Sequence, residues 1–256
     1  MIMSSLLAIG MLVTIVNIFV GIVTAKEAES LTFPSADGLK ITADVYLTNN
    51  PAKRPFIVLF HQAKWSRGEF RETAPRFNRL GFNCLAVDLR SGNKVRGVTN
   101  LTAQAAREKG KQTRFVDAMQ DMVAALKFVR ETYKPPQLLM LGSSYSAGLA
   151  LRVAGDYPNL VDGVMAFSPA EYFVKNGMSH TWVMDSAKYI TVPVFITSAK
   201  KEKNRWSALY GAINSHSKLS FVPDTAGKHG SRALWKKYPD SEEYWTVLEN
   251  FLKNYF

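Results

Sequence analysis

Ser144 and Ser146 lie in a stretch of small residues whose layout could present a nucleophile. The stretch follows the uncharged run 137–141, which is long enough for one buried strand, and a helical pattern begins at Leu149. A strand, a sharp turn and a helix in succession expose a serine hydroxyl for attack on a carbonyl. The nucleophile belongs about two residues beyond the strand, so the spacing favours Ser144 over Ser146. The alternative is an ordinary strand-to-helix turn in which the serines only cap the helix.

A nucleophilic serine requires a base and a carboxylate that orients this base. His229 is the preferred base, because it lies in a glycine-flanked loop after the last expected strand. Glu202 is the carboxylate in the loop after the strand expected over residues 192–197, and it is the preferred acid. Asp224, which is close to His229 in sequence, is the second candidate, and Asp185 is the third. Loops that follow parallel strands meet at one edge of a sheet, so these residues can come together there.

Backbone donors for a developing oxyanion can come from two segments. The N–H of Tyr145 directly follows the favoured nucleophile. The N–H of Ala63, or failing that of Gln62, lies in the loop after the strand expected over residues 56–60. Such donors stabilise the negative charge that forms when a serine attacks a carbonyl. The sequence carries no His, Cys and carboxylate cluster at metal-ligand spacing and no glycine-rich phosphate loop, so we expect neither a metal nor a cofactor.

The elements that must position these residues alternate between strand and helix. A hairpin is expected around the turn at Asp37 and Gly38. Buried strands are expected over mostly apolar runs, at residues 56–60, 82–88, 137–141, 161–167, 192–197 and 219–222. Helices are expected over residues 68–80, 116–133, 205–216 and 240–254. Residues 169–190 are irregular and have the length of a cap. The alternation predicts an α/β fold with a mostly parallel sheet and helices on both faces.

The amino terminus differs in character from the rest of the chain. Residues 6–25 carry no ionisable side chain, and the run ends in Val23-Thr24-Ala25, small residues typical of a signal-peptidase site. A cleaved signal peptide and a retained membrane anchor are therefore the two interpretations of residues 1–25. Either one predicts export to the periplasm, the cell envelope or the medium, with membrane association through residues 6–25 in the second case. One globular domain is expected over residues 26–256.

The composition limits the classes of partner. The chain of 256 residues has a formal net charge of +11. Its basic residues are scattered and form no stripe or known nucleic-acid module, so we expect no nucleic-acid partner. Cations do flank the candidate loops, at Lys64, Arg67, Lys200, Lys201, Lys203 and Lys228. If these loops converge, the mouth of the site is cationic and attracts an anionic small-molecule acyl substrate or an anionic surface; a solvated basic surface is the alternative.

With these motifs the chain resembles the α/β-hydrolase superfamily, close to its dienelactone-hydrolase-like and serine-esterase branches. The resemblance runs from about Leu31 to the C-terminus. The segments that carry it are His61-Gln62, Asp88-Leu-Arg-Ser-Gly92, Gly142-x-Ser144, Val192-Pro-Val-Phe-Ile and Lys228-His229-Gly230. It implies an α/β-hydrolase fold with an N-terminal hairpin and a short cap insertion.

The resemblance also implies roles for particular residues. Ser144 would be the nucleophile, His229 the base and Glu202 the acid of an exported, carboxylesterase-like serine hydrolase acting on esters or lactones through an acyl-enzyme. The chain departs from the family pattern at Ser146, where the elbow has its second glycine, and at Glu202, where aspartate is more frequent. The alternative function is a catalytically inactive binding protein of the same fold at the cell envelope.

Overall fold

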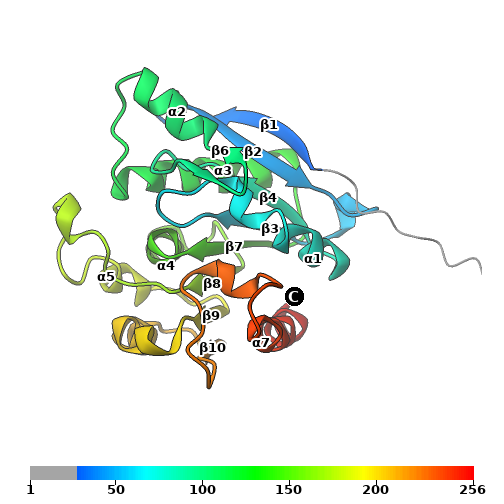
Figure 1. The fold of residues 1–256 in the computed structure, drawn as a ribbon, viewed down its shortest axis with the longest axis vertical. Coiled ribbons are helices and arrows are strands. Elements are labelled where there is room, and N and C mark those ends of the chain that lie inside the picture. Colours follow the sequence, from blue (N-terminus) through cyan, green and yellow to red (C-terminus); the bar gives the residue numbers. More distant parts are fainter. Residues whose placement is uncertain (1–27) are drawn as a thin grey trace, which may run out of the picture.

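The computed structural model describes residues 28–256 (Figure 1). The signal-peptide or anchor interpretation of residues 1–25 falls outside the described residues and stays a prediction. Within residues 28–256, no helix is long and apolar enough to span a membrane.

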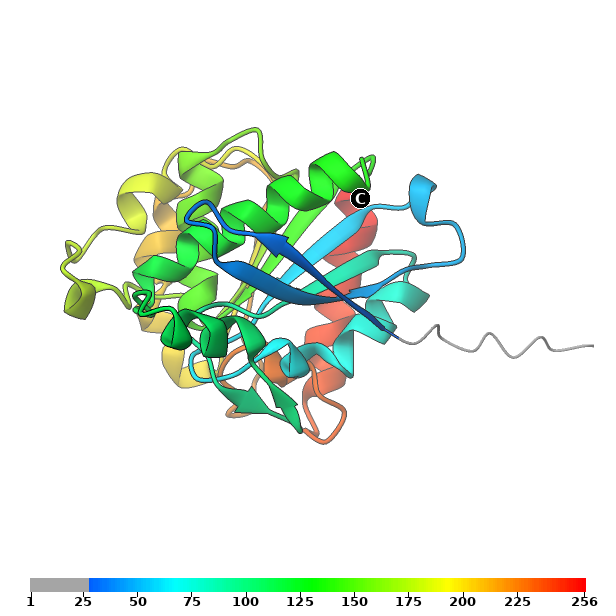
Figure 2. The ribbon, with the colours of Figure 1, turned by 90° about the horizontal axis from the view of Figure 1, so that it is seen from above.

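The chain folds around one mixed sheet whose strand order is β1-β2-β4-β3-β7-β8-β9-β10. The strands are β1 (Glu29–Pro34), β2 (Lys40–Tyr46), β3 (Phe56–Phe60), β4 (Asn83–Val87), β7 (Leu138–Ser143), β8 (Gly163–Phe167), β9 (Val194–Thr197) and β10 (Lys218–Phe221). The β1–β2 and β2–β4 pairs are antiparallel, and all later pairs are parallel. The predicted hairpin and mostly parallel sheet are thereby confirmed. Figure 2 looks onto the hairpin edge of this sheet.

Helices cover both faces of the sheet, because each central strand is apolar on both sides. Along β3, Val58 joins the core beneath one set of helices, whereas Ile57 and Leu59 join the core on the opposite face. The first face is covered chiefly by α3 (Met119–Thr132), α4 (Tyr145–Asp156) and α6 (Ser207–Ala212), and the second by α1 (Thr73–Arg79) and α7 (Ser241–Tyr255). In Figure 1, α4 lies to the left of the strands, and α1 and α7 lie to the right.

The structure departs from the sequence expectations at several local elements. The helix expected over residues 68–80 is two pieces, the 3₁₀ turn η2 (Arg67–Phe70) and α1. The short hairpin of β5 (Lys94–Val95) and β6 (Val98–Thr99) and the helix α2 (Leu101–Glu108) were not predicted. The break before α1 lets η2 turn its side chains inward, and all four of its residues are buried.

The expected cap, residues 169–190, is a short and mostly irregular insertion. It contains the 3₁₀ turn η4 (Val174–Asn176) and the helix α5 (Met184–Ala187). The insertion packs closely on α4, because a side chain at Gly155 would overlap the backbone of Ser186. The end of α5 is thus held against α4 instead of projecting away from the domain.

Candidate active site

Ser144 occupies the sharp turn between β7 and α4, in a strained conformation. Its φ of 62° and ψ of −120° lie in a region that residues with a side chain rarely adopt. Its N–H is held by the carbonyl of Phe167 at 2.8 Å. The turn closes tightly, since a Cβ on Gly142 would lie 2.6 Å from the Cα of Ala147. The fold therefore supports a costly conformation at the one serine that the spacing favours.

Three side chains from separate loops form a continuous hydrogen-bonded chain. Ser144 Oγ lies 2.8 Å from His229 Nε2, and His229 Nδ1 lies 2.7 Å from Glu202 Oε1. The three residues follow β7, β10 and β9 respectively, at the carboxyl edge of the parallel strands. If Nδ1 carries the ring proton and donates a hydrogen bond to the carboxylate, Nε2 is left to accept the proton of the serine hydroxyl.

Glu202 is buried and doubly hydrogen-bonded. Glu202 is only 6% exposed, and Ser168 Oγ donates to its Oε2 at 2.7 Å. Burial alone would raise the pKa of Glu202, but the hydrogen bonds from His229 and Ser168 outweigh it and lower the pKa. The group is therefore ionised at neutral pH. Ser168 also accepts the N–H of Gly230 at 2.9 Å, so it links the acid to the histidine loop.

The rival serine and the rival acids lie in other surroundings. Ser146 is fully buried, and its Oγ accepts the N–H of Ser143 at 2.8 Å and donates to a backbone carbonyl in β3. Asp224 is exposed, and its backbone oxygen accepts from a lysine at 2.7 Å. Asp185 is exposed and pairs with Thr181 one turn before it. Within residues 28–256, neither aspartate makes a hydrogen bond to His229.

Of the expected oxyanion donors, two backbone N–H groups stay available and one does not. The N–H of Tyr145 begins α4, where the first turn of a helix has free donors. The N–H of Gln62 donates to Glu69 Oε2 at 2.7 Å, so the alternative that assigned Gln62 as a donor is wrong. The N–H of Ala63 makes no hydrogen bond inside the described part of the chain. The pair Tyr145 and Ala63 therefore fits the role.

His61, which precedes the oxyanion loop, has a structural environment. Its Nδ1 lies 2.8 Å from the carbonyl of Gln62, and its Nε2 accepts the N–H of Leu89 at 2.9 Å. Burial lowers the pKa of His61 to about 4. A neutral imidazole thus fastens the oxyanion loop to the loop after β4.

Sequence reasoning missed two residues that lie close to Ser144 and Glu202, namely Tyr172 and Ser168. The Tyr172 hydroxyl donates to the carbonyl of Ser168 at 2.8 Å and lies against Ser144 and Arg205. Burial raises the pKa of Tyr172, so its hydroxyl is protonated at neutral pH. Tyr172 belongs to the insertion 169–190, whose composition alone does not indicate which side chain enters the site.

A cavity of about 630 Å³ adjoins His229 and Glu202. We call the four cations that line it the cationic mouth: Lys200, Lys201, Lys228 and Arg232. Lys64 instead lines a separate cavity of about 730 Å³. The expectation that Arg67 belongs to the mouth is wrong, because Arg67 is 9% exposed and paired to Asp44 at 2.8 Å and Asp88 at 2.7 Å.

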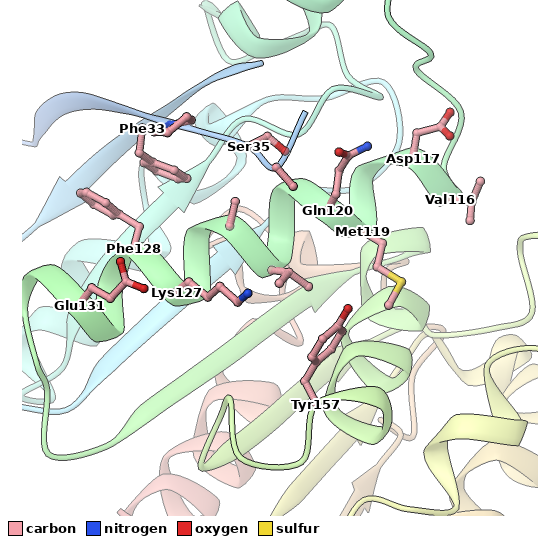
Figure 3. A pocket seen from close by; sticks show the side chains of 14 residues that line it. Phe33, Ser35, Val116, Asp117, Met119, Gln120, Lys127, Phe128, Glu131 and Tyr157 are labelled. Carbon is pink, nitrogen blue, oxygen red and sulfur yellow. The ribbon is translucent and has the colours of Figure 1, made fainter. Parts of the chain in front are cut away.

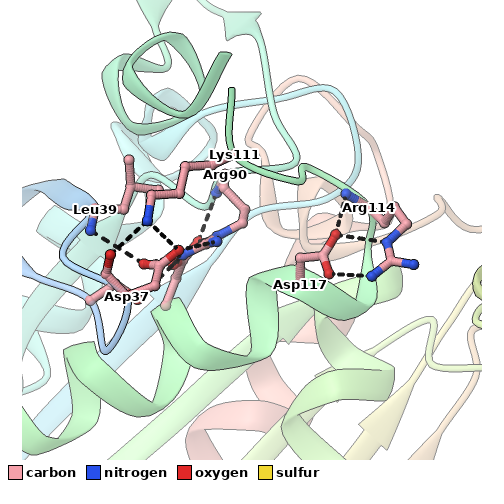
Figure 4. Close-up of polar contacts among 8 residues, drawn as sticks. Asp37, Leu39, Arg90, Lys111, Arg114 and Asp117 are labelled. Carbon is pink, nitrogen blue, oxygen red and sulfur yellow. Dashed lines mark hydrogen bonds and ion pairs between the residues drawn. The ribbon is translucent and has the colours of Figure 1, made fainter. Parts of the chain in front are cut away.

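A third cavity, of about 690 Å³, contains none of Ser144, His229 and Glu202 in its lining. It lies between the β1–β2 hairpin and α3, where Phe33 and Phe128 stack at 4.6 Å between ring centres (Figure 3). Near this cavity, Arg90 joins Asp37 at 3.0 Å, and Arg114 pairs with a carboxylate on the turn that precedes α3 (Figure 4). Arg90 is also paired to a buried carboxylate of α3. The two ion pairs of Arg90 hold the hairpin against α3, whereas the Arg114 pair is local to the turn before α3.

No cluster of three or more His, Cys, Asp or Glu side chains that could bind a metal ion occurs within residues 28–256.

Comparisons with known proteins place the fold. The family model described as serine aminopeptidase, S33, matches residues 51–210. An esterase of Pyrococcus furiosus superposes with a TM-score of 0.69 at 19% identity, over 90% of this chain and 93% of the other. The dienelactone hydrolase of Anabaena variabilis gives 0.69 at 12% identity, over 91% and 100% of the two chains. The acylaminoacyl peptidase of Pyrococcus horikoshii gives 0.62 at 14% identity, over 90% of this chain and 41% of the other. No curated protein matches the sequence.

Proposed function

The chain belongs to the α/β-hydrolase family described as serine aminopeptidase, S33, and on that premise we propose that it is a serine hydrolase that cleaves carboxylic esters. The observation that carries the proposal is the chain of hydrogen bonds from Ser144 through His229 to Glu202, with distances of 2.8 and 2.7 Å. Nucleophile, base and orienting acid are within reach of one another, as acyl transfer requires.

The first half of the reaction forms an acyl-enzyme. Ser144 Oγ attacks the carbonyl carbon of the substrate while its proton passes to His229 Nε2. The buried carboxylate of Glu202 stabilises the imidazolium through the Nδ1–H bond. The N–H groups of Tyr145 and Ala63 stabilise the oxyanion of the tetrahedral intermediate. Collapse of this intermediate breaks the ester C–O bond, and the leaving alkoxide takes the proton from Nε2.

The second half releases the acid. A water molecule gives its proton to His229 Nε2 as it attacks the acyl carbon. The second tetrahedral intermediate then expels Ser144, which recovers the proton. The net reaction consumes one water for each ester bond and needs no cofactor.

The charges around the site favour an ester over the amino-terminal peptide bond that the family description suggests. An aminopeptidase must hold the ammonium group of its substrate, which requires a free carboxylate near the nucleophile. The cavity beside His229 is lined by this histidine and by Glu202 but not by Ser144 itself. Glu202 is the one carboxylate of that lining, and both of its oxygens are already hydrogen-bonded. The other charged side chains of the lining are those of the cationic mouth, which repel an ammonium group and attract an anionic ester.

Comparing an ester with an aminopeptidase substrate tests this proposal. The full chain and the Ser144→Ala variant are assayed with 4-nitrophenyl butyrate and with alanine 4-nitroanilide. We expect ester hydrolysis that the substitution lowers at least about 10⁴-fold, with little anilide hydrolysis. Anilide hydrolysis as the main activity would replace the ester proposal, and no Ser144-dependent turnover of either would favour an inactive binding protein.

A further inference from the structure

Glu69 is a carboxylate buried beneath the active site, and the reaction outlined above does not use it. It belongs to η2 and is 0% exposed. Oε1 accepts from Ser143 Oγ at 2.7 Å and from Ser231 Oγ at 2.6 Å, and Oε2 accepts the N–H of Gln62 at 2.7 Å. These three partners adjoin the nucleophile, the histidine and the oxyanion donor respectively. A single side chain therefore contacts all three segments of the site.

The burial of this carboxylate costs folding free energy, which a merely structural position could avoid with an apolar residue. Burial raises the pKa of Glu69 to about 6 although its three partners lower it. Among described charged and titratable groups, Arg232 of the histidine loop and Tyr145 of α4 interact electrostatically with it. Arg232 favours the ionised form. A group that is kept ionised at this cost suggests a task that needs a negative acceptor.

We propose that Glu69 is a positioning residue for the oxyanion hole. By accepting the N–H of Gln62, Glu69 keeps this group from donating to an oxyanion. The same hydrogen bond fixes the following peptide group, which carries the N–H of Ala63. Through Ser143 and Ser231, Glu69 holds this loop in register with Ser144 and His229. The proposal deepens the proposed hydrolase function and rests on it for the catalytic consequence.

The bond network supports a role in alignment and not only in packing. Ser143 Oγ also accepts the N–H of Ser231 at 2.8 Å, so the elbow and the histidine loop are joined both directly and through Glu69. The oxyanion loop has no such second bond to Ser143 or Ser231 among the hydrogen bonds of residues 28–256. Trp65 of that loop does contact the histidine loop, since Arg232 lies 5.8 Å from the centre of its ring. Within residues 28–256, the carboxylate is therefore the hydrogen-bonded connection between the oxyanion loop and the other two segments. Its loss is expected to displace Ala63 more than Ser144.

Kinetics of Glu69→Gln and Glu69→Ala, with a matched control, test the catalytic consequence. The control is Asp121→Asn, which changes a carboxylate that is also 0% exposed but pairs with Arg90 away from the triad. For Glu69→Ala we expect kcat to fall about 10- to 100-fold with KM changed less than about threefold. The inhibition constant of a trifluoromethyl ketone, whose hemiketal places an oxyanion in the hole, should rise by the same factor. The control Asp121→Asn should lower the thermal stability and leave both kcat and the inhibition constant of the trifluoromethyl ketone unchanged.

The conservative variant and amide exchange complete the test. The ratio of kcat/KM between wild type and Glu69→Gln should shrink as pH falls from 7.5 to 5, because wild-type Glu69 then becomes protonated as well. In Glu69→Ala, amide exchange of residues 61–65 should accelerate, and the control should leave it unchanged.

These exchange data separate this proposal from the function. A wild type without esterase activity refutes the proposed function, whereas the positioning role still depends on exchange of the oxyanion loop. Unchanged exchange in Glu69→Ala, or kinetic losses equal to those of Asp121→Asn, would overturn the positioning role.

Discussion

Replacing Glu202 by glutamine tests how the base is oriented while the shape of the side chain is kept. In the wild type, Oε1 accepts from His229 at 2.7 Å and Oε2 accepts from Ser168 at 2.7 Å. A glutamine can accept through its oxygen at only one of these places and must present its NH₂ group at the other. The substitution therefore forces a choice between two orientations of the amide.

The hydrogen bonds of Ser168 determine which orientation of the amide in Glu202→Gln is more stable. Its Oγ accepts the N–H of Gly230 at 2.9 Å, so its own hydrogen is left to donate and draws the amide oxygen toward it. The NH₂ group then faces His229 Nδ1, and the ring proton moves to Nε2, where it blocks the transfer from Ser144. The productive orientation leaves a buried hydroxyl hydrogen unpaired, which costs about 1–3 kcal/mol. Only about one molecule in 5 to one in 150 then carries the productive tautomer.

Loss of the negative charge adds a second factor. A hydrogen bond to a charged acceptor is worth about 1 kcal/mol more than a neutral one, or about fivefold in rate. The two factors together predict that kcat/KM for a 4-nitrophenyl ester falls about 25- to 750-fold. The Asp224→Asn variant should stay within about twofold of the wild type.

The double variant sharpens this prediction. Removing the hydroxyl in Ser168→Ala frees the glutamine to turn, so Glu202→Gln with Ser168→Ala should be more active than Glu202→Gln alone, by up to about tenfold. The activities of the wild type, Glu202→Gln and the double variant are measured as ester hydrolysis at pH 8. An activity of Glu202→Gln within threefold of the wild type, or a double variant that is less active than the single one, would refute the assigned tautomer.

Four further predictions concern the elbow, the buried carboxylate and the mouth. Ser146→Ala should lower the free energy of unfolding by about 1–3 kcal/mol and keep most activity, because Ser146 satisfies only buried backbone groups. Gly142→Ala should prevent soluble folding, since its Cβ meets backbone that cannot move aside. The raised pKa of Glu69 means that its ionisation opposes folding; this cost, about 2 kcal/mol above pH 6, vanishes below pH 4.5. In urea unfolding, the free energy of unfolding of the wild type should therefore rise by about that amount relative to that of Glu69→Gln as pH falls from 7 to 4.5. Raising salt from 20 to 500 mM should lower kcat/KM of an ester carrying a carboxylate far more than that of its neutral analogue. An equal dependence of kcat/KM on salt for the two esters would show that the cationic mouth does not steer the substrate.

The sheet could be predicted from the sequence because its strands are apolar on both faces. Runs such as residues 56–60 and 137–141 have no polar alternation, which identifies buried parallel strands and places the loops after them at one edge. This logic brought Ser144, Glu202 and His229 to the same edge, and the structure places them within hydrogen-bond distance. The catalytic roles themselves remain predictions.

The supporting residues could not be predicted, because their role depends on which way a short turn faces. Arg67 was expected at the mouth of the site, and Glu69 fell in the helix expected over residues 68–80, yet η2 buries both. Gln62 was acceptable as an oxyanion donor until the structure showed its N–H bonded to Glu69. Ser168 gives no signal in the sequence, because its importance arises from two bonds to loops distant along the chain.

The central claim is that Ser144 is the nucleophile, and covalent labelling tests it most directly. The full chain is treated with a fluorophosphonate at pH 8, digested and analysed by mass spectrometry. The site geometry predicts one adduct, on Ser144 Oγ, that is absent in Ser144→Ala and strongly slowed in His229→Ala. An adduct on Ser146, or ester hydrolysis that survives in unlabelled Ser144→Ala, would contradict it.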